Sequence, residues 1–175
     1  MNLWLFGYGS LIWRPDINYL ERRVARVPGW SRRFWQGSHD HRGLPDAPGR
    51  VVTLIPEPDS YCEGMAYLVD QATAEQTFID LDYREKNGYE RHEVVLEFFD
   101  AGETSSGLVY IAPIGNHAYL GPAPLDTMAR QISRAAGPSG RNRDYLLELA
   151  DALRELDAHD SHVFELEAAV RELEQ

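Results

Sequence analysis

Cysteine is almost absent from this sequence, and so are long apolar runs. The one cysteine, Cys62, cannot form a disulfide within the chain, which favours a reducing compartment. No apolar stretch approaches the roughly 18 residues that a membrane span needs. The first residues also lack the basic region and apolar run of a signal peptide. We therefore expect a cytoplasmic protein with no membrane partner.

Positive charge is scarce as well. Against 28 Asp and Glu residues stand 17 Lys and Arg residues, so the formal net charge is -11. A nucleic-acid partner needs a basic surface to neutralise its phosphates, and this composition argues against one. The chain has 175 residues and a hydrophobic fraction of 43%, which is ordinary for a globular protein and sufficient for one domain with a sizeable core.

The chain begins with a short apolar run, Asn2–Phe6, that leads directly into Gly7-Tyr8-Gly9-Ser10. The run predicts a buried strand in the middle of a sheet. Glycines can take positive φ angles and leave peptide N–H groups uncovered, so the turn is suited to bind an anion. Ile12 stands where a dinucleotide fingerprint has its third glycine, and no P-loop lysine follows. The ligand type favoured is a small carboxylate, although a glycine turn without a ligand is an equally open interpretation.

Further along, predicted strands come first and most of the predicted helices come last. Pro28-Gly29 predicts a turn, Pro56 predicts the end of a strand, and Gly88 predicts the end of the first helix. This order predicts an α+β protein with a small mixed β-barrel or sheet of about six strands, a helix crossing it, and C-terminal helices. The expected strands cover 2–6, 20–27, 30–36, 50–55, 63–69, 89–99 and 106–112. The expected helices cover 73–84, 125–136, 143–158 and a last segment that is capped by Asp160.

Glu85 is the polar residue with the most informative position. It follows a predicted helix and precedes a predicted strand, where the negative end of the helix dipole disfavours a carboxylate. Burial beside Tyr83 and Tyr89 would raise its pKa further, as a proton-transferring carboxylate requires. The alternative is a solvated glutamate that pairs with Arg84 or Lys86.

Other polar residues suggest weaker hypotheses. His39 and His41 resemble half of a metal site if they lie on a strand, but no further ligands have suitable spacing. Cys62 has no histidine close in sequence and is more typical of a small buried residue than of a nucleophile. Residues 137–142 precede a helix and are compatible either with an anion site or with an interhelical loop. We expect no metal and no cofactor.

Taken together, a series of segments resembles the glutathione-specific branch of the ChaC-type γ-glutamylcyclotransferases. The segments occur in the family's order between residue 4 and about residue 155. No single one is decisive, but the ordered set is specific. They are FGYGSLIW (6–13), RRFWQGS (32–38), DHRG (40–43), PGRVVTL (48–54), YREKNGY (83–89), YLGPAPL (119–125) and GPSGRN (137–142).

The resemblance implies the small mixed α/β barrel of that group, as one domain over residues 1–175. It implies a cofactor-free reaction that converts glutathione to 5-oxoproline and cysteinylglycine, with Glu85 as the catalytic acid and base. The turn formed by Gly7, Tyr8, Gly9, Ser10 and Leu11 corresponds to the loop that holds the γ-glutamyl group. Glutathione is then the small-molecule partner, and the protein is expected to be a monomer or a weak dimer.

Some assignments stay open at this point. Arg42 and Arg50 are candidates for contacting the glycine carboxylate of glutathione, and a structural pairing role is about as probable for each. Other γ-glutamyl amino acids or amines are alternative substrates. A non-catalytic protein that binds glutathione through the same turn, or a metal-dependent barrel that uses His39 and His41, are alternative functions.

Overall fold

Five strands form a closed barrel in the computed structural model, which describes residues 2–175. Around the barrel the strands follow the order β1-β3-β2-β4-β5. β1 pairs antiparallel with β3 and parallel with β5, so the sheet is mixed. The expected α+β barrel is therefore confirmed. The strands are β1 (Leu3–Gly7), β2 (Glu21–Ser38), β3 (Gly49–Val69), β4 (Glu90–Phe98) and β5 (Thr104–Ile111).

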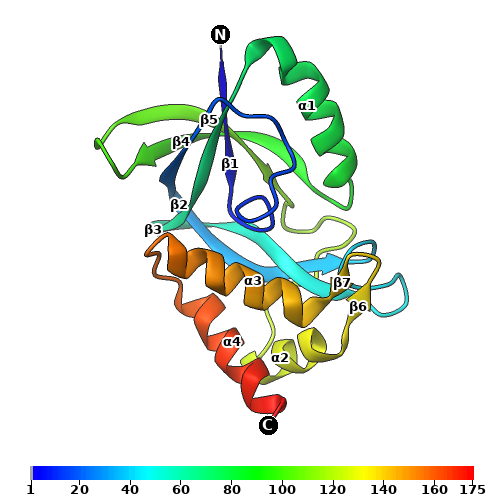
Figure 1. Ribbon diagram of the computed structural model, residues 1–175. Helices are drawn as coiled ribbons and strands as arrows, with labels where there is room; N and C mark the ends of the chain where they lie inside the picture. Colours follow the sequence, from blue (N-terminus) through cyan, green and yellow to red (C-terminus); the bar gives the residue numbers. More distant parts are fainter. Residues whose placement is uncertain (1) are drawn as a thin grey trace.

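Two of these strands are much longer than the sequence predicts. Pro28-Gly29 does not make a turn but lies at a shift in register within β2, and Pro56 lies inside β3 opposite Trp30. The predicted breaks there were wrong because a bulge accommodates a proline without ending the strand. Four predicted segments therefore merge into one long antiparallel pair, which bends from the barrel toward the C-terminal helices (Figure 1).

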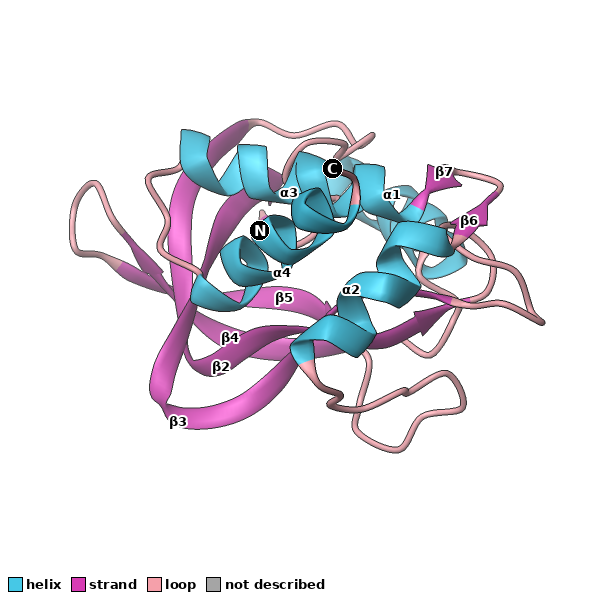
Figure 2. Ribbon diagram, turned by 90° about the horizontal axis from the view of Figure 1, so that it is seen from below, coloured by secondary structure: helices cyan, strands magenta, loops and turns pink. Residues whose placement is uncertain are grey.

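The C-terminal helices pack on this long pair of strands. They are α2 (Leu125–Arg134), α3 (Asn142–Glu155) and α4 (Ser161–Leu173), and a small hairpin of β6 (Ala136–Gly137) and β7 (Gly140–Arg141) lies between α2 and α3. Figure 2 shows the three helices lying together across the strands. Their buried side chains belong to the same apolar cluster as those of the barrel. As predicted, Asp160 caps α4, and its carboxylate accepts a hydrogen bond from the Val163 N–H at 3.1 Å.

Helix α1 (Gln71–Arg84) lies on the other side of the barrel (Figure 1). Asp70 caps its N-terminus by accepting a hydrogen bond from the Ala72 N–H at 3.0 Å. Phe78 and Leu81 pack in a second apolar cluster that also contains Leu5 and Leu11, whereas Ile79 is 55% exposed. The shared cluster fixes the helix against β1 and the turn that follows it.

None of the helices between residues 2 and 175 has the length and apolar character of a membrane span.

Candidate active site

Glu85 occupies the C-terminal end of α1. Its backbone leaves the helix at φ -102°, while its N–H still donates to the Leu81 carbonyl at 2.8 Å. Gly88 does not end the helix, as the sequence had suggested. It lies three residues later, at φ +95°, in the turn that leads toward β4. The end of α1 thus places the Glu85 carboxylate next to the turn that follows β1.

The turn formed by residues 7–11 has uncommitted backbone donors. Within the described part of the chain, the N–H groups of Gly9, Ser10 and Leu11 donate to no protein acceptor. The turn is held by hydrogen bonds that it accepts: Gly9 accepts from the Ile12 N–H at 2.9 Å, and Ser10 accepts from the Arg14 N–H at 2.7 Å. Free N–H groups on adjacent residues suit an anionic group or a polarised carbonyl oxygen.

The two glycines of this turn are needed for space rather than for positive φ. Neither Gly7 nor Gly9 has a positive φ angle, which corrects the conformational argument made from the sequence. A Cβ on Gly7 would lie 2.8 Å from the Leu11 Cβ. On Gly9 it would lie 2.9 Å from the Val52 Cγ2 and 3.0 Å from the Tyr145 hydroxyl. The absence of a side chain at residue 9 therefore keeps Tyr145 close to the turn.

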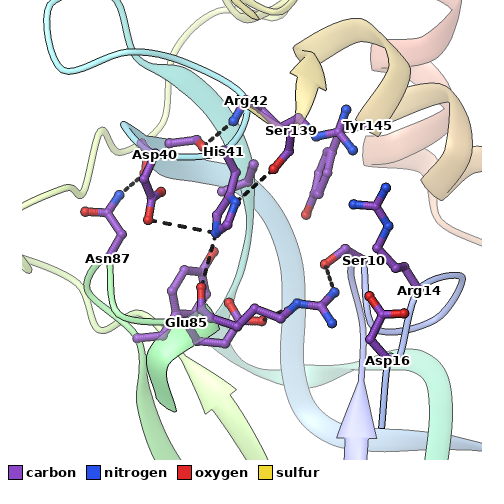
Figure 3. Close-up of a pocket in the computed structure, with 15 residues that line it drawn as sticks. Ser10, Arg14, Asp16, Asp40, His41, Arg42, Glu85, Asn87, Ser139 and Tyr145 are labelled. Carbon is purple, nitrogen blue, oxygen red and sulfur yellow. Dashed lines mark hydrogen bonds and ion pairs between the residues drawn. The ribbon is translucent and has the colours of Figure 1, made fainter. Parts of the chain in front are cut away.

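A cavity of about 260 Å³ lies between the turn and the end of α1, and Figure 3 shows its lining side chains. A smaller recess of about 40 Å³ adjoins it. The two spaces have Ser10, Glu85, Tyr89 and Tyr145 in common. Deeper barrel residues, including Tyr8 and Tyr110, line only the recess. Ser10 of the predicted turn and the predicted acid, Glu85, therefore line the same two adjoining spaces.

The Glu85 side chain is only 17% exposed. Burial raises the pKa of its carboxyl group above the usual glutamate value, although Arg84 and His41 act in the opposite direction. Among residues 2–175, no group donates a hydrogen bond to this carboxylate, and the nearest cation, the Arg84 Nε, lies 3.7 Å away. Tyr89 lines the cavity as expected, but Tyr83 is 73% exposed and does not contribute to the burial. The acid is thus desolvated and still able to accept a proton.

Arg84 connects the acid to the turn. Its guanidinium donates to the Ser10 hydroxyl at 3.0 Å and to the Pro15 carbonyl at 3.1 Å. The alternative of a solvated glutamate that pairs with Arg84 is half right: the two side chains form an ion pair at 3.7 Å, but Glu85 is buried, and both hydrogen bonds of Arg84 are shorter than this contact. Arg84 therefore mainly fixes the spacing between the helix end and the turn.

The His41 side chain connects the end of α1 to the β6–β7 hairpin. One ring nitrogen lies 3.2 Å from the Arg84 carbonyl, and the other lies 3.0 Å from the Ser139 hydroxyl (Figure 3). A carbonyl only accepts hydrogen bonds, so the Nε2 atom must carry a proton. His39 instead lies 3.2 Å from the Asn87 amide. Residues 2–175 contain no group of three or more His, Cys, Asp and Glu side chains arranged to hold a metal ion.

Tyr145 is one of the cavity residues that sequence reasoning missed. It lies on the buried side of α3 and looked like a core side chain. Its hydroxyl accepts a hydrogen bond from the Val52 N–H at 3.3 Å, and within residues 2–175 that hydroxyl donates to no acceptor. Burial raises the pKa of Tyr145 well above its ordinary value, so the group stays protonated. No spacing in the sequence could have revealed that this hydroxyl reaches the turn after β1.

The two arginines suggested as substrate contacts have different positions. Arg42 lines the cavity, and its guanidinium donates to the Arg141 carbonyl at 3.1 Å. Arg50 does not line either space. It donates to the Phe34 and Gly121 carbonyls, each at 2.9 Å. The Arg50 guanidinium therefore has the structural pairing role that was the alternative to a substrate contact.

The other residues singled out in the sequence lie in structural positions. Cys62 is buried, and burial raises the pKa of its thiol to about 11, which is unsuitable for a nucleophile. The segment before α3 forms the β6–β7 hairpin, whose Ser139 N–H donates to the His41 carbonyl at 2.9 Å. Tyr8 donates to the Tyr110 carbonyl at 2.6 Å and thereby anchors the turn in the barrel.

A Gly9→Ala substitution tests the need for space beside Tyr145. The new Cβ would overlap the Val52 methyl group and crowd the Tyr145 hydroxyl, so we expect turnover to fall by up to about 10²-fold. The stability should fall by only about 1–3 kcal/mol. Activity assays and urea unfolding measure the two effects. Gly102→Asn, in a turn where a Cβ meets nothing within 4 Å, is the control, and equal losses of activity in both variants would contradict the interpretation.

Comparisons with known proteins identify the family of this chain. The family described as ChaC-like protein matches residues 3–173. A glutathione-specific γ-glutamylcyclotransferase 1 from Danio rerio is 43% identical over 97% of this chain and 89% of that protein. The Homo sapiens protein of the same name is 43% identical over 96% of this chain and 78% of that protein. The crystal structure of a γ-glutamyl cyclotransferase specific to glutathione from yeast has a TM-score of 0.93 at 32% identity, covering 98% of this chain and 96% of that one.

Proposed function

This chain belongs to the ChaC-like protein family, and from that premise we propose that it is a glutathione-specific γ-glutamylcyclotransferase. The observation that carries the proposal is the pairing of two groups across one cavity. They are the desolvated carboxylate of Glu85, which accepts no hydrogen bond within residues 2–175, and the free N–H groups of the turn after β1. Together they suit a ligand with an ammonium group and a carbonyl or carboxylate close to each other, as in a γ-glutamyl group.

The substrate carries its own nucleophile in this reaction. Glu85 takes a proton from the α-ammonium group of the γ-glutamyl residue, and the freed amine attacks the γ-carbonyl carbon. A ring C–N bond forms, and the C–N bond to cysteine then breaks. The departing nitrogen receives the proton held by Glu85, and the second proton, which the ring nitrogen loses as the lactam forms, passes by the same carboxylate to the freed amine of cysteinylglycine. The products are 5-oxoproline and cysteinylglycine. No water is consumed, because the step is an intramolecular aminolysis that releases the dipeptide; enzymes of this type are classed with the lyases.

Positioning accounts for much of the expected rate increase. The γ-glutamyl chain must fold so that its amine meets its own carbonyl, and holding this geometry contributes roughly 7–11 kcal/mol in the best cases. The cavity of about 260 Å³ contains both Glu85 and Ser10 of the turn, so we place the γ-glutamyl group beside them and the cysteinylglycine part in the remainder of the same cavity. The N–H groups of Gly9, Ser10 and Leu11 bind the α-carboxylate, and the Tyr145 hydroxyl donates to the oxyanion that develops on the γ-carbonyl oxygen.

The environment of Glu85 supports its role in both proton transfers. Burial raises the pKa of the carboxyl group, which brings a glutamate closer to the range in which it can both accept and return a proton near neutral pH. Tyr89 contributes to that burial, and its own hydroxyl is used on the Val52 carbonyl at 2.7 Å. Tyr89 therefore shapes the site and is not a second acid.

The wider setting follows from the same proposal. Glutathione is the small-molecule partner, and the one thiol of the chain, Cys62, is buried and suited to a reducing compartment such as the cytoplasm. We also propose that residues 1–175 act as one γ-glutamylcyclotransferase-like domain, as a monomer or weak dimer, without a cofactor.

Mass spectrometry of glutathione incubated with the purified protein tests the proposal. We expect equimolar 5-oxoproline and cysteinylglycine to appear as glutathione disappears. Intact glutathione together with measurable binding would instead indicate a non-catalytic binding protein. Faster cyclisation of other γ-glutamyl amino acids or amines than of glutathione would overturn the substrate assignment. Activity that falls on addition of a chelator would contradict the cofactor-free mechanism.

A further inference from the structure

Two arginines lie on one side of the outer cavity. Both Arg14 and Arg42 line the cavity that contains Glu85. In Figure 3 their guanidinium groups lie on the Tyr145 side of the pocket, across from Asp40 and Asn87. The Arg42 guanidinium is 5.7 Å from the centre of the Tyr145 ring. The part of the cavity away from the acid is therefore bordered by cations.

Arg14 and Arg42 make fewer hydrogen bonds to other protein groups through their guanidinium N–H donors than Arg84 does. Arg84 donates to the Ser10 hydroxyl and the Pro15 carbonyl. Arg42 donates to the Arg141 carbonyl and has a distant acidic neighbour, Glu148, at 3.7 Å. Within residues 2–175, Arg14 forms no hydrogen bond from its side chain and no ion pair. All of its guanidinium N–H donors are therefore available to a ligand.

Arg14 is also held close to the proposed site of the γ-glutamyl head. Its N–H donates to the Ser10 carbonyl at 2.7 Å, so its backbone lies directly over the turn. In the proposed substrate, the dipeptide beyond the γ-carbonyl spans at most about 7 Å when extended. It ends in a carboxylate, and a guanidinium group binds a carboxylate through two parallel hydrogen bonds.

We propose that Arg14, assisted by Arg42, binds the C-terminal carboxylate of the substrate and so selects γ-glutamyl peptides that have a free carboxylate at this end. The inference rests on the proposed function and adds a specificity-determining residue to it. Asp16 lines the same cavity and would repel an anion, so the positive charge of Arg14 also offsets this acidic neighbour. Arg14 recognises the substrate carboxylate and takes no part in the proton transfers.

The test compares glutathione with its glycine ethyl ester, which lacks the negative charge but keeps the γ-glutamyl group. The wild-type protein should have a kcat/KM about 10- to 100-fold higher for glutathione than for the ester. Arg14→Gln should lower this ratio toward 1 by raising the KM for glutathione, while kcat and the KM for the ester change little. Arg14→Lys keeps the positive charge but cannot form the two parallel hydrogen bonds of a guanidinium group. It should therefore retain part of the preference for glutathione over the ester.

Arg130→Gln is the matched control, because Arg130 is an exposed arginine on α2 that pairs with Asp126 of the same helix. It should behave like the wild type with both substrates. Equal losses for glutathione and ester in Arg14→Gln, or no change in their ratio, would overturn the inference. If the wild type formed no 5-oxoproline from either compound, the proposed function would fail instead. Calorimetric binding of glutathione and ester to the wild type and Arg14→Gln would then still decide whether Arg14 recognises the carboxylate.

Discussion

Replacing Glu85 with glutamine is expected to lower turnover of glutathione by about 10²–10⁴-fold, the usual contribution of a positioned acid and base. Glutamine has nearly the same shape and cannot take up the proton of the α-ammonium group. Because no group within residues 2–175 donates a hydrogen bond to the Glu85 carboxylate, the substitution breaks no such contact in the protein. The loss should therefore appear chiefly in kcat, and the binding of glutathione should weaken only by the lost attraction between the carboxylate and the α-ammonium group.

Quantification of 5-oxoproline over a range of pH measures this prediction. In the wild type, activity should decline as pH falls through the pKa of Glu85, which burial raises above the ordinary glutamate value. The residual activity of Glu85→Gln should lack this acidic limb. Glu75→Gln, an exposed position on the same helix, is the matched control and should keep the wild-type profile. Wild-type turnover in Glu85→Gln would refute the role of the acid.

Glu85→Gln should lower activity, but it should not lower the stability of the fold. Burial makes the folded-state pKa of Glu85 higher than the unfolded-state value, so folding favours the neutral carboxyl group. That stabilisation is fully present below the unfolded pKa and is lost as pH rises through the folded pKa. Glu85→Gln does not undergo this loss. It should thus unfold at the same temperature as the wild type at acidic pH, and at an equal or higher temperature at neutral pH.

The sequence predicted the local elements that carry the site better than the tertiary arrangement that brings them together. The run before Gly7, the helix that ends beside Glu85 and the cap at Asp160 have local signals, and each was found where expected. The merging of strands at Pro28 and Pro56 could not be predicted, because it depends on which neighbouring strand supplies the hydrogen bonds at a bulge.

The missed cavity residues share a physical cause. Tyr145 has the spacing of an ordinary core position on α3, and only the approach of Gly9 to its hydroxyl gives it a place in the cavity. His41 was considered as a metal ligand because of His39, yet it faces the Ser139 hydroxyl and the Arg84 carbonyl. These roles depend on partners distant in sequence, about which local spacing carries no information.

Arg32 is a polar residue whose removal should destabilise the fold strongly. Its side chain is only 1% exposed, and its Nε donates to the Asp160 carboxylate at 2.9 Å. The rest of the guanidinium donates to the Tyr8 carbonyl at 2.9 Å and to the Glu63 carbonyl at 2.8 and 2.9 Å. One buried cation therefore joins the turn of the active site, strand β3 and the cap of α4.

Arg32→Met should lower the free energy of unfolding by about 3–5 kcal/mol, because it leaves a buried charge and two carbonyls without their partner. Urea unfolding measures this loss. Arg33→Met, at the neighbouring position where the arginine side chain is 27% exposed, should cost much less. In the Arg32→Met background, Asp160→Asn should restore part of the stability, since asparagine keeps a capping oxygen and removes the unpaired charge. If Arg32→Met and Arg33→Met had equal effects, the guanidinium of Arg32 would not be the link between the turn and the C-terminal helices.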